Sequence, residues 1–338
     1  MSLPRQVRWL AVIALCSPSA SLSAQGFGLN EIGTCAVARG FAVTGATCDD
    51  ASVIFWNPAA TAELATRSIS LGANAIIIKG GFTQDTSGIR YPSNIQPALV
   101  PSFFGNVHRG RVAIGLGVYV PYGLTSQWYD NFPGRFSALK AKLTSIYVQP
   151  NVAYQLNNNW SIGGGPVLGN STVELTQALD LSQQVAAVVG GVPISFGQLG
   201  IANNTEFGRV RLKGSSHAVG YNVGIHGKYN GWSIGGRYLS ALGFHYSGAD
   251  ATFTQTATGL ILAQNNPIVP KGASAPLDLV LASQFTGSGA LTNQFGDSRI
   301  TDPWQAQAGI GYSGFAGTTL SADIVRIGWS KFGTLPVT

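Results

Sequence analysis

Apolar residues alternate with small or polar residues over several stretches of this chain. The alternation is clearest in residues 112–120, 146–156, 219–229 and 232–246. Successive side chains of a β-strand point to opposite faces, so a period of two indicates strands with one apolar face and one polar face. The sequence therefore predicts an all-β fold built from amphipathic strands.

Nine strands are predicted after residue 64, and the lengths of their connections follow a rule. The connections after even-numbered strands are a few residues long, whereas those after odd-numbered strands are long. Bacterial transmembrane barrels have short periplasmic turns and long outer loops. A soluble β-sandwich, the alternative, explains the alternation but not this sorting of loops. The strands are expected near residues 68–78, 98–107, 111–122, 144–156, 160 onward, 218–229, 232–246, 304–315 and 318–332.

Two further signals mark the end of the sheet with the short turns. Asn230-Gly231 is typical of a type I′ hairpin turn, which needs positive φ at both central residues. Aromatic residues near the short turns suggest the girdle of a membrane interface, namely Tyr154, Trp160, Tyr229 and Trp232.

Composition favours a membrane protein that crosses with strands. Only 10% of the 338 residues are charged, whereas soluble domains carry about 25%. No apolar run after the leader reaches the roughly 18 residues of a spanning helix. A closed sheet is the other structure that satisfies every backbone group in lipid, so we predict a transmembrane antiparallel β-barrel. The net charge of +6 is not gathered into a basic stripe, and no nucleic-acid partner is expected.

Residues 1–24 are typical of a cleavable secretory signal. A positively charged start precedes a short apolar run at 9–15, and small residues at 21–24 offer a cleavage site. Cleavage leaves two cysteines, Cys35 and Cys48. Export into an oxidising compartment makes a disulfide between them one expectation. Two buried free thiols are the equal alternative.

Residues 25–64 lack the strand alternation and are expected to form a compact hatch inside a barrel of residues 65–338. The hatch segment is rich in glycine, carries the acidic pair Asp49 and Asp50, and ends with Asn57-Pro58-Ala59. Proline suits the first turn of a helix because its missing N–H needs no partner there. Short helical turns joined by loops are therefore predicted.

Two long connections, residues 172–207 and 248–302, are more apolar than water-facing loops should be. Such loops either pack together or bind a hydrophobic ligand. The first half of the earlier loop has the spacing of a short amphipathic helix. The candidate ligand contacts in these loops are Val188, Val189, Ile194, Phe196, Leu260 and Ile261.

Several short motifs follow one another in a recognisable order. The most specific are Asn57-Pro58-Ala59 and the acidic pair before it. The others are Gly26-Phe27-Gly28-Leu29-Asn30-Glu31, Gly45-Ala46, Pro303-Trp304 and Trp329-Ser330-Lys331-Phe332. Together they resemble the FadL/TodX family of outer-membrane transporters for hydrophobic compounds, over essentially the whole mature chain.

The resemblance implies a barrel of about 14 strands filled by an N-terminal hatch. It also implies that a ligand is caught between the loops 172–207 and 248–302 and moves to a pocket near Phe27 and Leu29. The ligand then leaves sideways through a gap made by a kink in the third strand.

The candidates for that kink are Pro121, Gly115 and Gly117. Proline cannot donate to a strand ladder, so Pro121 predicts locally broken pairing. The alternative is that Pro121 simply ends the third strand where the outer loop begins.

The sequence departs from the family pattern in two places. Nine strands are an odd number, and residues 335–338 lack the terminal aromatic of such barrels, so we expect a member shortened by about five strands. No basic residue lies at 169–174, where some members place one beside a fatty-acid carboxylate. This departure favours a neutral hydrocarbon as the ligand.

The motifs that could carry catalysis lack the necessary context. Residues 231–235 match G-x-S-x-G, but they open a strand rather than a strand-to-helix elbow. The four histidines lack metal-ligand spacing. We therefore expect no enzyme activity, cofactor or metal.

The predicted function is the passage of hydrophobic small molecules, either long-chain fatty acids or hydrocarbons, across the bacterial outer membrane by a monomer. The expected partners are the hydrophobic ligand, outer-membrane lipid and lipopolysaccharide. The alternatives are a water-filled porin and a surface adhesin or receptor barrel.

Overall fold

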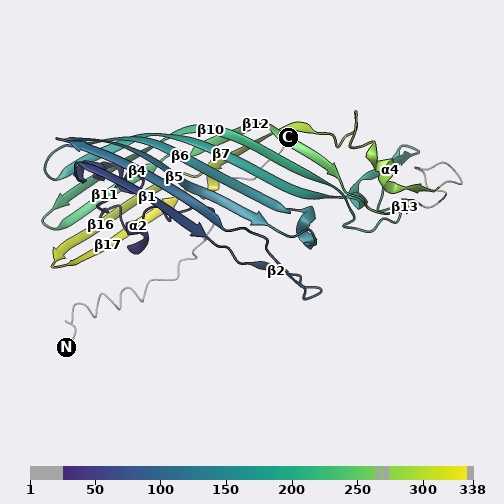
Figure 1. Cartoon of the computed structure of the whole chain (residues 1–338), viewed down its shortest axis with the longest axis horizontal. Coiled ribbons are helices and arrows are strands. Elements are labelled where there is room, and N and C mark those ends of the chain that lie inside the picture. The colour runs from purple at the N-terminus through teal and green to yellow at the C-terminus, as the bar shows by residue number, and fades with distance from the viewer. Residues whose placement is uncertain (1–25, 263, 265–267, 269–273, 333–338) are drawn as a thin grey trace.

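The computed structural model describes residues 26–262, 264, 268 and 274–332. Long antiparallel strands lie side by side in one sheet and run along the long axis of the molecule (Figure 1). Their order in the sheet follows their order in the chain. The strands on this path are β1 (Arg67–Ile76), β4 (Ala98–Arg109), β5 (Val112–Gln127), β6 (Lys140–Gln155), β7 (Trp160–Asp180), β10 (Glu206–Tyr229), β11 (Trp232–Leu239), β16 (Gln305–Phe315) and β17 (Thr318–Ile327).

Two further strands extend this sheet toward the long loops. β12 (Leu242–Gln255) pairs with the outer half of β10, and β15 (Gln294–Asp302) pairs with β12. The strand predicted at 232–246 is therefore interrupted at Ser240 and Ala241, and a second break at Pro303 and Trp304 separates β15 from β16. The last predicted strand also ends early, because a 3-10 turn, η4 (Trp329–Lys331), follows β17.

The apolar face of the sheet points outward and the polar face points inward. On β10, for example, Val219, Tyr221 and Val223 are exposed, whereas Asn222 and His226 are fully buried. A soluble sandwich has the opposite arrangement, because it buries its apolar faces against each other. An exposed apolar face over a polar interior is the arrangement of a sheet surrounded by lipid.

Short turns and long loops are sorted to opposite ends, as the sequence predicts. Asn230 and Gly231 have φ of 47° and 81°, which fits the predicted type I′ turn. The aromatic residues predicted for a girdle, Tyr154, Trp160, Tyr229 and Trp232, are all exposed. At the opposite end the long loops extend beyond the sheet around α4 (Leu277–Ala282) and β13 (Ile261–Leu262) (Figure 1).

The loop predicted at 172–207 contains strand rather than the expected helix. Residues 172–180 continue β7. Their backbone groups pair with β10, as do those of the rest of β7. A 3-10 turn, η3 (Leu181–Gln183), then leads into a hairpin of β8 (Val185–Val189) and β9 (Val192–Ser195). Cross-strand hydrogen bonds thus outweigh the helical spacing of the apolar residues.

The other outer connections contain only short elements. They are β2 (Gly81–Thr83), β3 (Arg90–Pro92), η2 (Pro133–Phe136) and β14 (Ala275–Pro276). Across the described part of the chain, no helix has the length and hydropathy needed to cross a membrane. The predicted signal at 1–24 and the C-terminal residues 335–338 lie outside the described residues.

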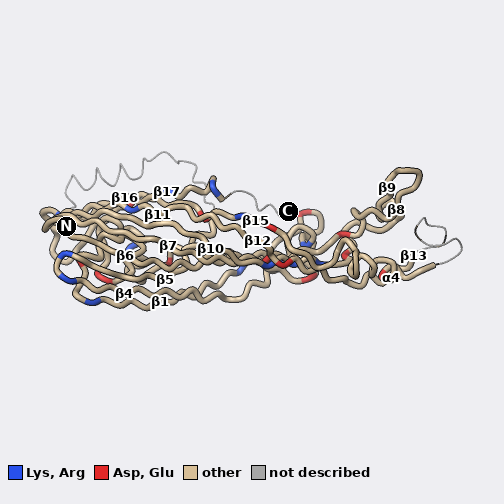
Figure 2. Tube along the Cα trace, turned by 90° about the horizontal axis from the view of Figure 1, so that it is seen from above, with Lys and Arg blue, Asp and Glu red and all other residues tan. Residues whose placement is uncertain are grey.

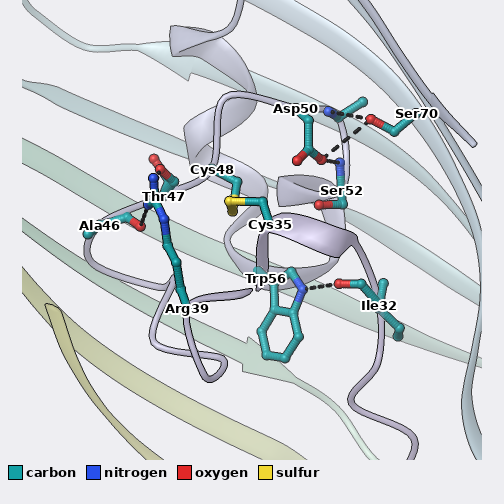
Figure 3. The surroundings of a disulfide bond; sticks show 11 residues. Ile32, Cys35, Arg39, Ala46, Thr47, Cys48, Asp50, Ser52, Trp56 and Ser70 are labelled. Carbon is teal, nitrogen blue, oxygen red and sulfur yellow. Dashed lines mark hydrogen bonds between the residues drawn. A yellow bond between two sulfur atoms is a disulfide. The ribbon is translucent and has the colours of Figure 1, made fainter. Parts of the chain in front are cut away.

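The N-terminal segment forms three short helical elements against the inner face of the sheet. They are α2 (Thr34–Ala38), α3 (Val53–Trp56) and the 3-10 helix η1 (Pro58–Glu63). A disulfide joins Cys35 to Cys48 (Figure 3). Beside it, Asp50 accepts a hydrogen bond from the backbone N–H of Ser52, and Trp56 donates to the carbonyl of Ile32. We call residues 26–64 the hatch.

We expect the Cys35→Ser/Cys48→Ser variant to loosen the hatch while leaving the sheet intact. A disulfide that closes a loop of this length stabilises by about 3 kcal/mol. Limited proteolysis in detergent should then cut between residues 35 and 48 faster than in the parent protein. Cleavage in the β8–β9 hairpin serves as the control and should be unchanged, and equal protection of residues 35–48 in both proteins would contradict the prediction.

Candidate functional site

The buried side chain of Asn57 joins the hatch to the wall. Its Nδ2 donates to the carbonyl of Thr44 at 2.9 Å and to that of Ile225 on β10 at 3.1 Å. Its Oδ1 accepts from the N–H of Ala59 at 3.3 Å and caps η1. One amide therefore connects two hatch segments and a wall strand. Because the site is shielded from water, loss of the Asn57 amide would leave the Thr44 carbonyl without this donor.

The other two residues of the Asn57-Pro58-Ala59 motif lie against β6 and β7. Pro58 is the first residue of η1, and its carbonyl accepts from Asn151 Nδ2 on β6 at 3.2 Å. A Cβ at Gly163 on β7 would come within 2.8 Å of the Ala59 Cα. The motif thus lies at one of the places where hatch and wall backbones approach closely.

Glycine at the wall explains a repeated sequence in the chain. Trp-Ser-Ile-Gly-Gly occurs at 160–164 and again at 232–236. In each copy the first glycine, Gly163 or Gly235, faces the hatch, and a Cβ at Gly235 would collide with the carbonyl of Thr44. The repeat therefore provides flat wall surface for the hatch, and its G-x-S-x-G match belongs to a strand.

Polar side chains of the wall form hydrogen bonds with the end of helix α3. The carbonyls of Ile54 and Phe55 accept from Asn222 Nδ2, and Gln149 Nε2 also donates to Ile54. Arg237 packs over the Phe55 ring, 4.1 Å from its centroid. Carbonyls in the last turn of a helix lack partners within the helix, so these wall side chains satisfy them. Arg237 itself is hydrogen-bonded to the amide oxygens of Asn222, Gln305 and Gln307.

Glu63 at the end of η1 forms the ionic contact between hatch and wall. It pairs with His226 and Lys228 on β10 and accepts from Ser161 on β7. Burial by itself raises the pKa of Glu63, but the hydrogen bonds and charges of His226 and Lys228 outweigh it and lower the pKa to about 2. The carboxylate therefore stays charged and attached at neutral pH.

The beginning of the hatch is bound to β5. The N–H of Leu29 donates to the carbonyl of Pro121, and the N–H of Gly123 donates to that of Phe27, each at 2.8 Å. The Phe27 ring contacts Tyr122, Trp329 and Phe332 at centroid distances of 5.9, 5.0 and 4.4 Å. Residues 27–29 thus take up hydrogen bonds that a neighbouring strand would otherwise make.

The pairing between β4 and β5 ends at Phe103 and Val118, and the hatch segment attaches a few residues further along β5, at Pro121 and Gly123. Residues 98–102 of β4 pair only with β1, and the register between β5 and β6 shifts between Tyr119 and Tyr122. Pro121 lies inside this irregularity and has no N–H to donate. The alternative that Pro121 ends the strand is wrong, because β5 continues to Gln127.

The two glycine candidates for the kink are placed differently. Gly115 and Gly117 are regularly paired with both β4 and β6. A Cβ at Gly115 would lie 2.8 Å from the Ile54 side chain. These glycines therefore permit close approach of the hatch, and the ladder is not broken there.

A cavity of about 680 Å³ lies at the interrupted pairing. Its lining combines Leu29 of the hatch, Val100 and Pro101 of β4, and Val118 and Val120 of β5. It also includes outward-facing apolar residues, namely Leu99 and Ile146. The cavity therefore connects the hatch end to the apolar outer surface. Pro101 is not among the predicted kink residues, although a second proline in a strand pattern is a usable signal.

The six loop residues proposed as ligand contacts differ in how far they are buried. Phe196 is buried in an apolar cluster between the two outer loops, beside Leu181, Phe207 and Leu277. Packing within this cluster explains the apolar side chain of Phe196. Ile194 is half-buried, whereas the remaining four are exposed: Val188, Val189, Leu260 and Ile261.

A second cavity, of about 340 Å³, lies at the base of the outer loops, and none of the six candidates lines it. Its apolar wall includes Leu175, Val210, Leu212 and Phe253, from β7, β10 and β12. The predicted strands did not reach these residues, because β7 extends beyond the predicted loop start at 172, β10 begins before 218 and β12 continues past 246. They follow the same alternation as the rest of β10 and β12.

The two acidic residues of the hatch lie in different surroundings. Asp50 faces β1, where Ser70 Oγ donates to it at 3.4 Å. Asp49 is exposed and lines a polar cavity of about 510 Å³ at the short-turn end, with Arg39 and Lys228. Neither carboxylate lies near the two apolar cavities.

An outward-facing apolar sheet, a polar wall and a buried N-terminal hatch define an outer-membrane β-barrel protein with an occupied interior. The chain belongs to the family of outer membrane protein transport proteins (OMPP1/FadL/TodX), whose family model matches residues 14–338. Membership places the protein in the bacterial outer membrane. It also places it among transport proteins rather than enzymes.

Individual relatives agree with this assignment. The chain is 27% identical over 296 residues to the 47 kDa outer membrane protein of Pasteurella multocida (strain Pm70), covering 85% of this chain and 67% of that protein. It is 31% identical over 223 residues to the long-chain fatty acid transport protein of Escherichia coli O6:H1, covering 63% of this chain. The match covers 49% of the E. coli protein, so the chain spans about half of that relative's length.

Solved structures support the fold. A FadL homologue from Pseudomonas aeruginosa superposes with a TM-score of 0.69 at 20% identity, covering 93% of this chain and 72% of that one. The toluene transporter TbuX of Ralstonia pickettii superposes with a TM-score of 0.56 at 18% identity, covering 93% and 75%. At such identities the likeness establishes the β-barrel fold.

Gly235→Ala should weaken hatch docking, whereas Gly236→Ala should not. The methyl group at 235 meets the carbonyl of Thr44, but the one at 236 has its nearest neighbour at 3.5 Å. Overpacking of this kind costs about 1–3 kcal/mol. Thermal unfolding in detergent should show a lower midpoint for Gly235→Ala alone, and identical midpoints would contradict this account of the repeat.

The attachment of η1 to β10 should weaken in acid. Because the pKa of Glu63 is lowered from 4.5 to about 2, its stabilising contribution is complete above about pH 4.5 and is lost as the pH falls toward 2. The protection factors of the η1 amides, taken relative to their intrinsic exchange rates at each pH, should therefore fall over that range. Glu63→Gln should exchange faster at pH 7 and lose the pH-dependent step, whereas Asp49→Asn, which removes an exposed carboxylate, should retain it.

Proposed function

We propose that this protein lets hydrophobic small molecules cross the outer membrane by passive diffusion, with entry between the outer loops and exit sideways into lipid. The supporting observation is the 680 Å³ cavity, which joins the hatch end Leu29 to the outer surface where β4 and β5 separate. Relatives named for long-chain fatty acid and toluene transport support the same class of substrate. Long-chain fatty acids and neutral hydrocarbons are therefore both candidate ligands.

Entry is driven by removal of apolar surface from water. Each Å² of apolar ligand surface buried against the 340 Å³ outer cavity contributes about 25 cal/mol. Leu175, Leu212 and Phe253 provide that apolar contact. No cofactor or energy source is needed for a ligand that moves down its concentration gradient.

A lateral exit follows from the polarity of the interior. Below the cavity, the wall carries Gln149, Asn222 and Arg237, all buried and bonded to hatch groups or to one another. An apolar ligand gains nothing there and would separate polar groups from their partners. The opening between β4 and β5 leads instead to the apolar outer surface. The protein works as a monomer surrounded by outer-membrane lipid.

Filling the cavity should slow uptake. In Leu29→Trp, the larger ring occupies space between the hatch and β5, so initial uptake of labelled oleate and of labelled toluene should fall severalfold. Leu71→Trp is the matched control because Leu71 is an exposed residue on the outer face of β1. Normal uptake by Leu29→Trp at equal protein level in the outer membrane would reject the lateral route.

Asn57→Ala should impair uptake without preventing membrane insertion. Removal of the amide takes away the donor to the Thr44 carbonyl, a cost of about 1–3 kcal/mol, and breaks the link to the carbonyl of Ile225. Asn158→Ala in an exposed short turn is the control.

Planar-bilayer conductance should remain low for the parent protein, and a large steady conductance would favour the porin alternative.

A further inference from the structure

On three adjacent strands, the outward-facing side chains change from apolar to polar at one row of the sheet. The row Ile146–Asn170–His217, in register across β6, β7 and β10, is the first with polar side chains. Below it, toward the short turns, the exposed residues are apolar, among them Leu168, Val219 and Tyr221. Above it follow a hydroxyl row, Thr144–Thr172–Ser215, and then a charged row, Lys142–Glu174–Lys213.

The charged row and the next one toward the loops carry an excess of positive charge. Glu174 accepts at 2.9 Å from both Lys140 and Arg211. Lys142 and Lys213 flank the same carboxylate by register, but they form no ion pair with any described residue. One further carboxylate, Asp250, lies opposite Lys213 on β12. We call Lys140, Lys142, Arg211 and Lys213 the basic band.

The depth of the basic band matches a lipid headgroup. Strands rise about 3.3 Å per residue and tilt about 40° in such barrels, so Glu174 lies about 35 Å above the aromatic level of Trp160. The apolar belt of an outer-membrane barrel is about 25 Å tall. The cations therefore lie roughly 10 Å beyond the belt, on the side of the long loops. Figure 2 shows charged residues gathered where the sheet meets those loops, with few along the strands between.

We propose that the basic band binds the phosphate groups of a glycolipid in the outer leaflet of the outer membrane, with the acyl chains of that lipid lying on the apolar surface directly below. The surplus cations complement a phosphate, and Leu168, Val219 and Tyr221 complement the chains. A soluble anion would use the cations alone, and a protein partner would not require the apolar surface beneath them. This inference rests on the location of the protein in the outer membrane and not on the transported substrate.

The test compares lipid binding to the whole protein in detergent by native mass spectrometry. The probes are a diphosphorylated lipid A and the same lipid after removal of its phosphates. The parent protein should bind the phosphorylated form at least tenfold more tightly. Lys142→Gln/Lys213→Gln should bind it about 30-fold more weakly, because each cation near an anionic lipid surface contributes about fivefold. Equal binding of the two lipids by the parent protein would overturn the proposal.

Two control variants separate a local site from general charge. Lys142→Arg/Lys213→Arg should retain binding, and Lys79→Gln, an exposed lysine outside the band, should leave it unchanged. Millimolar inorganic phosphate should displace little lipid, since it lacks the chains. Full displacement by inorganic phosphate would show an anion site without a lipid, and equal losses in Lys79→Gln and the double Gln variant would show only long-range attraction. Either result overturns the proposal.

Discussion

A sheet that turns its apolar face toward lipid must bury its polar face, and the buried polar groups need hydrogen-bond partners. This constraint governs the interior of the protein. The hatch supplies the partners: the backbone carbonyls of Thr44, Ile54 and Pro58 accept from hatch and wall amides, and Asn57 reaches the carbonyl of Ile225. Removal of the hatch would therefore leave polar wall groups without the bonds they make here.

The hatch is held differently at its two ends. Its C-terminal part is fixed by side-chain amides and by the Glu63 ion pairs to β10. Its beginning is fixed to β5 by two backbone hydrogen bonds and an aromatic cluster around Phe27. The first attachment is polar and surrounded by buried partners, whereas the second borders the 680 Å³ apolar cavity through Leu29. The attachment with apolar surroundings thus lies beside the candidate exit.

The sequence predicted the strand pattern well because lipid on one side and a polar interior on the other enforce a period of two. It failed where a long-range partner decides the structure: residues 172–180 have helical spacing but pair with β10, and η4 turns inward to bring Trp329 against Phe27. The motif residues Asn57-Pro58-Ala59 were recognisable locally. The inner positions that line the outer cavity, such as Leu212, were missed because the predicted strand began at residue 218, whereas β10 begins at Glu206 and keeps the same alternation throughout.

The glycines that face the hatch have a consequence for what the protein excludes. With only hydrogen atoms at Gly163 and Gly235, the hatch lies directly against the wall at these two points, and there is no room even for a Cβ. Displacing residues 27–29 would uncover the side exit while that contact remains closed. A hydrophobic molecule would then pass while protons, ions and sugars are held back. The cell would therefore keep its permeability barrier during uptake.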